Sequence, residues 1–299
     1  DCRQICLKMN TSTKLIRQKQ TRKPIADKLR KLESKIKSME SVIVAYSGGI
    51  DSTFLAAYAQ KVLGNRVLAV TASSPSLPLS ELDLCVDLAK QLRLNHRVIQ
   101  TNEVNRPEYQ ANSPSRCFFC KDELYLHLLK IADQEHYMHV ANGANCDDLG
   151  DFRPGLSAAK RHNISSPLVD AGLTKQDIRN ASKKMGLPNW NKPAQACLAS
   201  RIPYGTRVSP ELLLRISKAE AFLNQLGLNS FRVRHHNSVA RIEVPPSEFD
   251  LLIDDEIRGE ITKYFRSIGY TYTTLDLDGF RSGSLNEPLE IKNNHDSSS

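Results

Sequence analysis

The sequence predicts an α/β protein: a doubly wound parallel sheet followed by a smaller C-terminal α+β domain. Three observations support this prediction. An apolar run over residues 42–46 breaks at a glycine-rich loop and continues as a helical pattern. Strand-like and helix-like segments then alternate as far as residue 185, which is typical of a parallel sheet. Beyond residues 186–193, which are rich in glycine, proline and asparagine, the order of elements changes.

The first predicted domain, residues 25–189, begins with an amphipathic helix over residues 25–39. Its strands are expected at residues 42–46, 67–71, 96–100, 138–141 and 166–169. Its further helices are expected from residue 53 and over residues 79–92, 121–134 and 175–185. Because ligands of such sheets bind at the carboxyl ends of the strands, the loop that follows the first strand is a candidate site.

The second predicted domain, residues 190–286, has a different element order. Helices are expected at residues 210–226 and 255–268, and short strands at 231–235, 240–244 and 270–277. This order predicts a three-stranded sheet backed by helices. Residues 1–24 are predicted to be a disordered extension, and residues 287–299 a flexible tail.

The composition fits a folded chain that binds polyanions. The 299 residues are 40% hydrophobic, enough for two domains, and the net charge is +8. This charge suits either nucleic acid or a small polyanion such as ATP. Much of the basic excess lies in residues 14–37, where a solvated helix face is favoured over a nucleic-acid arm. With no membrane-spanning apolar run and no signal-peptide pattern, a soluble cytoplasmic protein is expected.

The loop after the first strand reads Ser-Gly-Gly-Ile-Asp-Ser, residues 47–52. Gly48 and Gly49 let the backbone approach an anion, and the following helix directs free N–H groups into the loop. Ser47 and Ser52 add hydroxyl groups, and Ser52 suits a helix N-cap. The lysine of the Walker pattern is absent. The loop therefore predicts a different kind of phosphate cradle, with a plain strand-to-helix turn as the alternative.

Three cysteines are candidates for chemistry. Cys117 and Cys120 form a C-x-x-C pattern at the start of a helix, where Arg116 and Lys121 favour thiolate. The pattern alone leaves open a redox pair, a metal site or no role. Together with the remote Cys197, the pair suits three corners of a 4Fe–4S cluster with one iron left open. The alternative is that Cys197 is only a packing residue.

Acidic side chains follow the strand predicted at residues 138–141. Gly143 would admit backbone N–H groups near a nucleotide, and Arg153 could hold an anionic substrate. Carboxylates suit Mg²⁺, and the candidates are Asp147, Asp148 and Asp151. A solvated acidic loop is the alternative.

Two arginines alternate in the strand predicted at residues 231–235. Side chains two apart in a strand share a face, so Arg232 and Arg234 would form an anion site suited to phosphate. A solvated strand face is the alternative. Ser200 and Arg201 lie beside Cys197, and Glu220 is a candidate acid or metal ligand.

Taken together and in order, these motifs resemble one family. The segments are SGGIDST, RCFFCKDELY, DDLGDFRPG, KPAQACLASRIPYGT, FRVRHH and DLDGFRSGS, which extend over residues 41 to about 287. The loop resembles that of the PP-loop (N-type) ATP pyrophosphatases, whose fold is adenine nucleotide alpha hydrolase-like. The whole set resembles the ATP-dependent sulfur transferases of nickel-pincer nucleotide biosynthesis, the LarE family.

The resemblance implies a reaction in two stages. ATP adenylates a carboxylate of pyridinium-3,5-biscarboxylic acid mononucleotide, and sulfur then displaces AMP to give a thiocarboxylate. Repetition gives the bis-thio product, which binds nickel as the cofactor of lactate racemase and related enzymes. Some family members sacrifice one cysteine sulfur, whereas others carry sulfide on a 4Fe–4S cluster held by three cysteines. This chain resembles the three-cysteine kind.

The resemblance also implies roles for residues. Catalysis is assigned to Cys117, Cys120, Cys197, Asp51 and Lys121. ATP binding is assigned to Ser47, Gly48, Gly49, Asp51, Ser52 and Gly143. Substrate binding is assigned to Ser200, Arg201, Arg232, Arg234 and Arg153. The cofactors implied are ATP, Mg²⁺ and a 4Fe–4S cluster. The expected partner is a small-molecule mononucleotide, without membrane or nucleic acid, in a homo-oligomer such as the hexamers of the family.

Two other functions remain open at this point. A tRNA thiolase of the PP-loop superfamily would use the same loop and a cluster, and the basic N-terminal stretch favours it. A non-catalytic adenine-nucleotide sensor would bind ATP without releasing pyrophosphate.

Overall fold

The computed structural model describes residues 24–150, 154–193, 196–281 and 284–285. The disorder predicted for residues 1–24 and 287–299 lies, except for residue 24, outside these ranges. No helix within the described ranges is long and apolar enough to cross a membrane.

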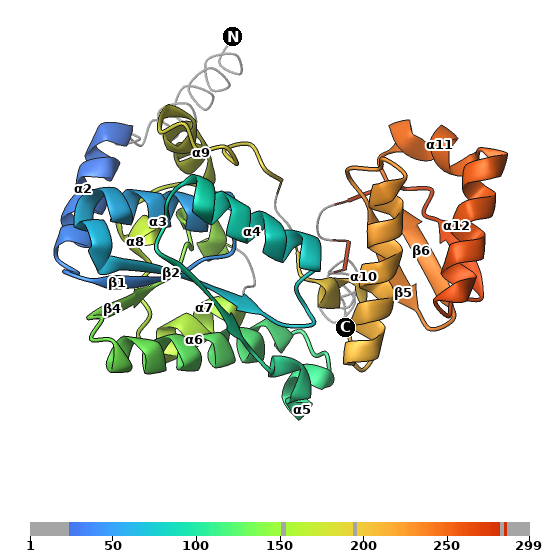
Figure 1. Ribbon diagram of the computed structural model, residues 1–299, viewed down its shortest axis with the longest axis horizontal. Coiled ribbons are helices and arrows are strands. Elements are labelled where there is room, and N and C mark those ends of the chain that lie inside the picture. The colour runs from blue at the N-terminus through green and yellow to red at the C-terminus, as the bar shows by residue number, and fades with distance from the viewer. Residues whose placement is uncertain (1–23, 151–153, 194–195, 282–283, 286–299) are drawn as a thin grey trace, which may run out of the picture.

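A four-stranded parallel sheet forms the centre of the N-terminal part (Figure 1). Its order is β3-β2-β1-β4, with β1 (Val42–Ala45), β2 (Val67–Ser73), β3 (His96–Gln100) and β4 (His139–Ala141). The chain moves outward from β1 to β3 and then returns to the other side of β1. The switch point therefore lies between β1 and β4, where sheets of this kind bind ligands beyond their carboxyl ends. The predicted parallel α/β architecture is confirmed.

Helices cover both faces of this sheet (Figure 1). One face carries α2 (Ile25–Lys37), α3 (Ile50–Leu63), α4 (Leu79–Gln91), α8 (Pro167–Asp170) and α9 (Lys175–Lys184). The other carries α6 (Arg116–Gln134) and α7 (Pro154–Arg161). Successive residues of β1 point to opposite faces, so Val42 and Val44 join the first core and Ile43 the second. The central strand β1 is apolar along its length and β2 is apolar over its first four residues, because both faces of the sheet are buried there.

Three local predictions need correction. The strand expected at residues 166–169 is wrong: Ser165 forms a single bridge with Ala141, and Pro167 then occupies the first turn of α8, where its fixed φ is suited. The N-cap of α3 is Gly49 rather than Ser52, because the helix begins at Ile50. Helix α6 begins at Arg116 instead of residue 121, so both cysteines of the C-x-x-C pattern lie inside it.

The C-terminal part has a three-stranded sheet, as predicted, with order β5-β6-β7. Strands β5 (Arg232–His236) and β6 (Val239–Glu243) are antiparallel, whereas β7 (Tyr272–Leu275) lies parallel to β6. Helices α10 (Pro210–Gln225) and α12 (Asp255–Ser267) pack on the sheet, and α11 (Phe249–Ile253) precedes α12. The domain limits at residues 189 and 190 stay a prediction.

A small apolar cluster joins the two parts of the chain. Leu198 and Ile202, from the connecting segment, pack with Tyr109 of α5 (Pro107–Gln110) and with Ile216 of α10. Because Cys197 directly precedes Leu198, this cluster fixes the position of the third candidate cysteine.

Candidate active site

The loop of residues 47–52, called the phosphate loop below, owes its conformation to a glycine and to two serine side chains. Gly48 has a φ of +65°, and a Cβ there would lie 2.5 Å from the sulfur of Cys85, so only glycine fits. The hydroxyl of Ser52 accepts a hydrogen bond from the Ser47 backbone N–H at 3.1 Å and lies 3.1 Å from the Ser47 hydroxyl. Both serines therefore define the loop conformation.

A second loop meets the phosphate loop at the switch point. Gly143 follows β4, and a Cβ on it would lie 2.8 Å from the backbone nitrogen of Ser52. Glycine is thus required for the loop after β4 to touch the first turn of α3. The two predicted nucleotide-binding loops do lie together.

Asn189 holds the phosphate loop from the connecting segment, and the sequence contained no signal for it. Its side-chain amide donates to the carbonyl of Gly48 and to the hydroxyl of Thr53, both at 3.0 Å. The side chain is buried, so these bonds are protected from water. We infer that Asn189 orients the loop.

The acidic residues after β4 have local partners. The carboxylate of Asp147 accepts from the backbone N–H of Lys175 at 2.7 Å, and that of Asp148 from the N–H of Asn145 at 3.1 Å. Within the described ranges, no group of three or more His, Cys, Asp or Glu side chains has the geometry to hold a metal ion. Asp151 and Arg153 lie outside those ranges. A magnesium role for these aspartates stays a prediction.

The three candidate cysteines influence one another although they come from two segments. Burial is the main cause that raises the pKa of Cys120, to about 12, and Cys197 and Cys117 add to the rise. Desolvation and then Cys197 likewise raise the pKa of Cys117, while Arg116 and Lys121 act in the opposite direction. The described structure places the turn that carries Cys197 against the first turn of α6, where the Arg116 guanidinium donates to the Ala199 carbonyl at 2.8 Å.

Lys121 supplies positive charge beside these sulfur atoms. Burial favours its neutral form, but Tyr125 and the three cysteines outweigh burial and raise the pKa of the ammonium group. In the described part of the chain, no carboxylate forms an ion pair with it. Gly155 leaves room for its stem, since a Cβ there would lie 3.1 Å from the Lys121 Cγ. The negative charge of the Tyr125 phenolate and of neighbouring thiolates thus favours the ammonium form of Lys121.

Two of the predicted substrate-binding arginines are occupied by protein groups. Arg201 is 2% exposed, pairs with Glu220 through two bonds of 2.8 and 3.0 Å, and donates to the carbonyl of Ala196 at 2.7 Å. Arg234 donates to Glu243 at 3.0 Å and to the carbonyl of Ser200 at 2.6 Å. Both guanidinium groups thus support the turn that carries Cys197. Their predicted binding of substrate stays a prediction.

Arg232 differs from its two neighbours. Its one hydrogen bond in the described structure goes to the carbonyl of Phe231 at 2.7 Å, and its guanidinium lies 5.0 Å from the ring centre of Phe280. Burial, followed by the positive charge of Arg201, lowers its pKa to about 10. An anion bound here would relieve both effects.

The cysteine site, formed by Cys117, Cys120 and Cys197, lies close to the carboxyl end of β2. The same edge of the sheet carries the phosphate loop. The backbone N–H of Leu198 donates to the carbonyl of Ser76 at 2.9 Å, and the Ser76 hydroxyl lies 2.6 Å from that of Tyr109. Burial, and then the charges of Cys197 and Cys120, raise the pKa of the Tyr109 phenol. Neither Ser76 nor Tyr109 was predicted, because each stands in sequence without a motif.

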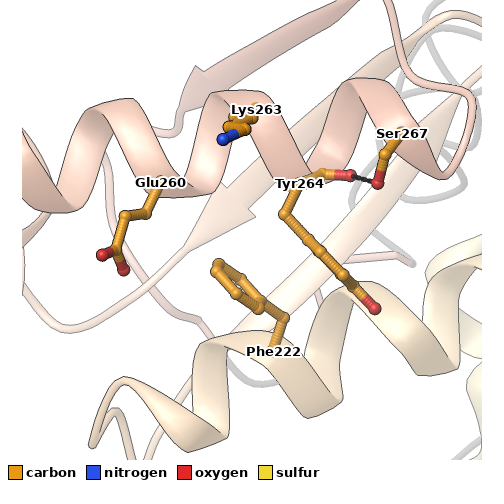
Figure 2. Close-up of a pocket in the computed structure, with 5 residues that line it drawn as sticks. All are labelled: Phe222, Glu260, Lys263, Tyr264 and Ser267. Atoms are coloured by element: carbon orange, nitrogen blue, oxygen red, sulfur yellow. Dashed lines mark hydrogen bonds between the residues drawn. The ribbon is translucent and has the colours of Figure 1, made fainter.

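A separate surface hollow lies between α10 and α12, away from all of these residues. Its volume is about 420 Å³, and Figure 2 shows its lining: Phe222, Glu260, Lys263, Tyr264 and Ser267. The rings of Phe222 and Tyr264 stack across it with centroids 4.2 Å apart. None of the predicted site residues lines it.

Comparison with known proteins agrees with this geometry. The family model described as NAD synthase matches residues 22–123, which include the phosphate loop. The chain is 36% identical to the pyridinium-3,5-bisthiocarboxylic acid mononucleotide synthase of Lactiplantibacillus plantarum, over 89% of this chain and 96% of that protein. The chain belongs to the LarE family of ATP-dependent sulfurtransferases.

Other relatives of this LarE-family chain extend the comparison. It is 43% identical to an uncharacterized protein of Synechocystis, over 89% of this chain and 99% of that protein. A glutamine-hydrolyzing GMP synthase component of Sulfurisphaera tokodaii is more distant, at 24% identity over 63% of this chain and 56% of that protein. The family resemblance drawn from the motifs is therefore confirmed, and so is its expectation of an ATP-dependent sulfurtransferase.

Proposed function

We propose that this enzyme adenylates the carboxylates of pyridinium-3,5-biscarboxylic acid mononucleotide and converts them to thiocarboxylates. The product named for the relative from Lactiplantibacillus plantarum supports this substrate. The observation that carries the proposal is the position of the cysteine turn. Leu198, next to Cys197, is bonded to Ser76 just beyond β2, at the edge that holds the phosphate loop.

The first stage needs the phosphate loop. A carboxylate is a poor electrophile because its negative charge repels nucleophiles and its leaving group would be oxide. In adenylation, a carboxylate oxygen bonds to the α-phosphorus of ATP, and the bond from that phosphorus to the bridging oxygen breaks. Pyrophosphate leaves with the electron pair, and backbone N–H groups of the loop, with Mg²⁺ held by phosphate oxygens, would stabilise its charge.

The second stage needs the cysteine site. Sulfur bonds to the acyl carbon, the bond from that carbon to the phosphate oxygen breaks, and AMP leaves. Cys117, Cys120 and Cys197 would hold a 4Fe–4S cluster, since three thiolates suit three irons and leave one iron open. In the described ranges these cysteines are not placed to share a single metal ion, so the proposal rests on the chemistry of the three thiols. The cluster, when bound, supplies sulfide as the nucleophile. Lys121, whose ammonium form these thiolates favour, would stabilise the negative charge of the sulfur ligands.

The mononucleotide phosphate would bind at Arg232. Within the described ranges this guanidinium forms no ion pair with a carboxylate, whereas Arg201 and Arg234 do. These two neighbours add positive potential while they support the Cys197 turn. The substrate would then lie between this cation and the phosphate loop. The homo-oligomer implied by the resemblance stays a prediction.

The tRNA thiolase alternative is less well supported. Basic residues on α2 that could contact nucleic acid form ion pairs within the protein: Lys28 with Asp177 at 2.6 Å and Lys35 with Asp170 at 3.1 Å. These pairs favour the solvated helix face that the sequence predicted for this part of the basic stretch.

The proposal is tested by incubating anaerobically purified protein with ATP, Mg²⁺, sulfide and the biscarboxylic mononucleotide. The expected result is pyrophosphate release that depends on the mononucleotide, with a product in which sulfur replaces oxygen, detected by mass spectrometry. Asp51→Ala should stop both. Thiolation of tRNA instead, or ATP binding with no pyrophosphate under any condition, would contradict the proposal.

A further inference from the structure

Arg116 is a buried cation without an acidic partner. Arg116 is 3% exposed, and no carboxylate in the described structure forms an ion pair with its guanidinium group. Burying a guanidinium is unfavourable unless its charge and its donors are matched by other groups. The groups that match Arg116 therefore indicate what it is for.

The hydrogen bonds of Arg116 connect the two cysteine segments. Arg116 directly precedes Cys117 in the first turn of α6, and its guanidinium donates to the carbonyl of Ala199 at 2.8 Å. Ala199 follows Cys197 by two residues, within the 3-10 helix Leu198–Arg201. One side chain thus joins the C-x-x-C turn to the Cys197 turn.

Asn112 completes this connection. Its side-chain oxygen accepts a hydrogen bond from Arg116, and its amide nitrogen donates to the carbonyls of Pro203 at 2.8 Å and Thr206 at 2.9 Å. Asn112 is fully buried, with a φ of 51° that asparagine tolerates better than most residues. Arg116 and Asn112 together attach residues 199–206 to the start of α6.

The groups that contact the Arg116 guanidinium are neutral: the Ala199 carbonyl, the Asn112 side-chain oxygen and the ring of Tyr204, whose centre lies 6.0 Å away. A sulfur group held by thiolates would be net negative, so the buried cation and the proposed ligand have complementary charges. Both bonds come from Nη1 of the planar guanidinium fork, whose two N–H directions are fixed, whereas a lysine ammonium on a flexible stem would not hold both acceptors as well.

We propose that Arg116 is a positioning residue, which holds the Cys197 turn against the C-x-x-C turn through Ala199 and Asn112. This inference rests on the proposed function, in which the three cysteines deliver sulfur together. Arg116 would thus assemble the cysteine site by contacting the backbone beside Cys197, without contacting the substrate.

The test measures how close the cysteines lie in reduced, metal-free protein. Dibromobimane alkylates two neighbouring thiols, and peptide mass spectrometry distinguishes a bridge from Cys197 to α6 from a bridge between Cys117 and Cys120. In Arg116→Met, the bridges to Cys197 should fall about thirtyfold, the factor expected for two lost buried hydrogen bonds of ordinary strength. The bridge within α6 and ATP binding should persist. Arg161→Met is the matched control, because that arginine is exposed and contacts α6 through Asp122 and the ring of Phe118, beside the C-x-x-C turn, without a bond to the Cys197 turn in the described structure.

Arg116→Lys separates geometry from charge and also serves if Arg116→Met does not fold. It keeps the positive charge but not the fork, and the Cys197 bridges should again be largely lost while ATP binding persists. Bridging at the wild-type level in Arg116→Met or Arg116→Lys would overturn the inference, as would an equal loss in Arg161→Met. Unfolding of both Arg116 variants would also overturn it, by showing a role in folding. Absence of Cys197 bridges in the wild type would instead overturn the proposed function.

Discussion

The phosphate loop and the cysteine site are built by different means. The loop after β1 uses backbone N–H groups, and its shape depends on Gly48, Gly143 and the hydroxyl of Ser52. The cysteine site uses buried side-chain cations, and its shape depends on hydrogen bonds between residues far apart in sequence, such as Arg116 to Ala199 and Arg234 to Ser200. Local sequence thus builds the first region and tertiary contacts build the second, so mutations should separate the two stages of the reaction.

The largest separation is expected from the cysteines. Cys117→Ser, Cys120→Ser and Cys197→Ser should each lower the rate of sulfur transfer about a thousandfold or more. Each variant removes one of the three thiolates that would hold the proposed cluster. Pyrophosphate release should continue through one turnover. Anaerobic absorption spectra and single-turnover pyrophosphate assays measure the two effects. If only Cys197→Ser acted, and each chain lost one sulfur atom, the sacrificial route would apply instead.

The phosphate loop should show the opposite pattern. Gly48→Ala combines a φ of +65° with a Cβ placed 2.5 Å from the Cys85 sulfur, and we expect ATP affinity to fall about a hundredfold. Gly64→Ala is the control, since that glycine has a φ of +63° but no heavy atom within 4 Å of the added Cβ. Titration calorimetry would measure both. Equal losses of ATP affinity would show that backbone strain alone, at any site, explains the effect.

Arg232 and Arg234 should differ although they are neighbours on one strand. Arg232→Ala should weaken mononucleotide binding about thirtyfold with little change in unfolding free energy, because it removes a charge-assisted contact worth about 2 kcal/mol. Arg234→Ala should destabilise the fold by about 3 kcal/mol, since it leaves the fully buried Glu243 with the partly exposed Arg241 as its remaining ion-pair partner in the described structure. Ligand titration and denaturant unfolding would distinguish them. Equal effects of both variants on both measurements would contradict this assignment.

The smallest effect is expected at Asn189. Asn189→Ala removes the two bonds to Gly48 and Thr53 and should weaken ATP binding about fivefold, because the loop loses support but keeps its own donors. Binding of the mononucleotide should be unchanged. Asn180→Ala, on the exposed part of α9, is a suitable control because its side chain bonds only to Gln176. A loss of mononucleotide affinity as large as the loss of ATP affinity would argue that Asn189 supports both regions.

The same contrast explains what the sequence could predict. The phosphate loop was predicted because its glycines, serines and helix lie within a few consecutive residues. The parallel sheet was predicted because its buried strands are continuous apolar runs. Arg116, Asn189 and Tyr109 act through partners between 33 and 141 residues away, and nothing beside them in sequence indicates this. The strand expected at residues 166–169 failed because Pro167 begins a helical turn there.

The central claim is that both regions act on one molecule in sequence, and it is tested most directly by withholding sulfur. Protein given ATP, Mg²⁺ and the biscarboxylic mononucleotide, but no sulfide, would be quenched and analysed by mass spectrometry. We predict pyrophosphate together with an adenylated mononucleotide, which disappears with release of AMP when sulfide is added to cluster-loaded protein. Pyrophosphate release without any adenylated mononucleotide, or an adenylate that sulfide leaves unchanged, would contradict it.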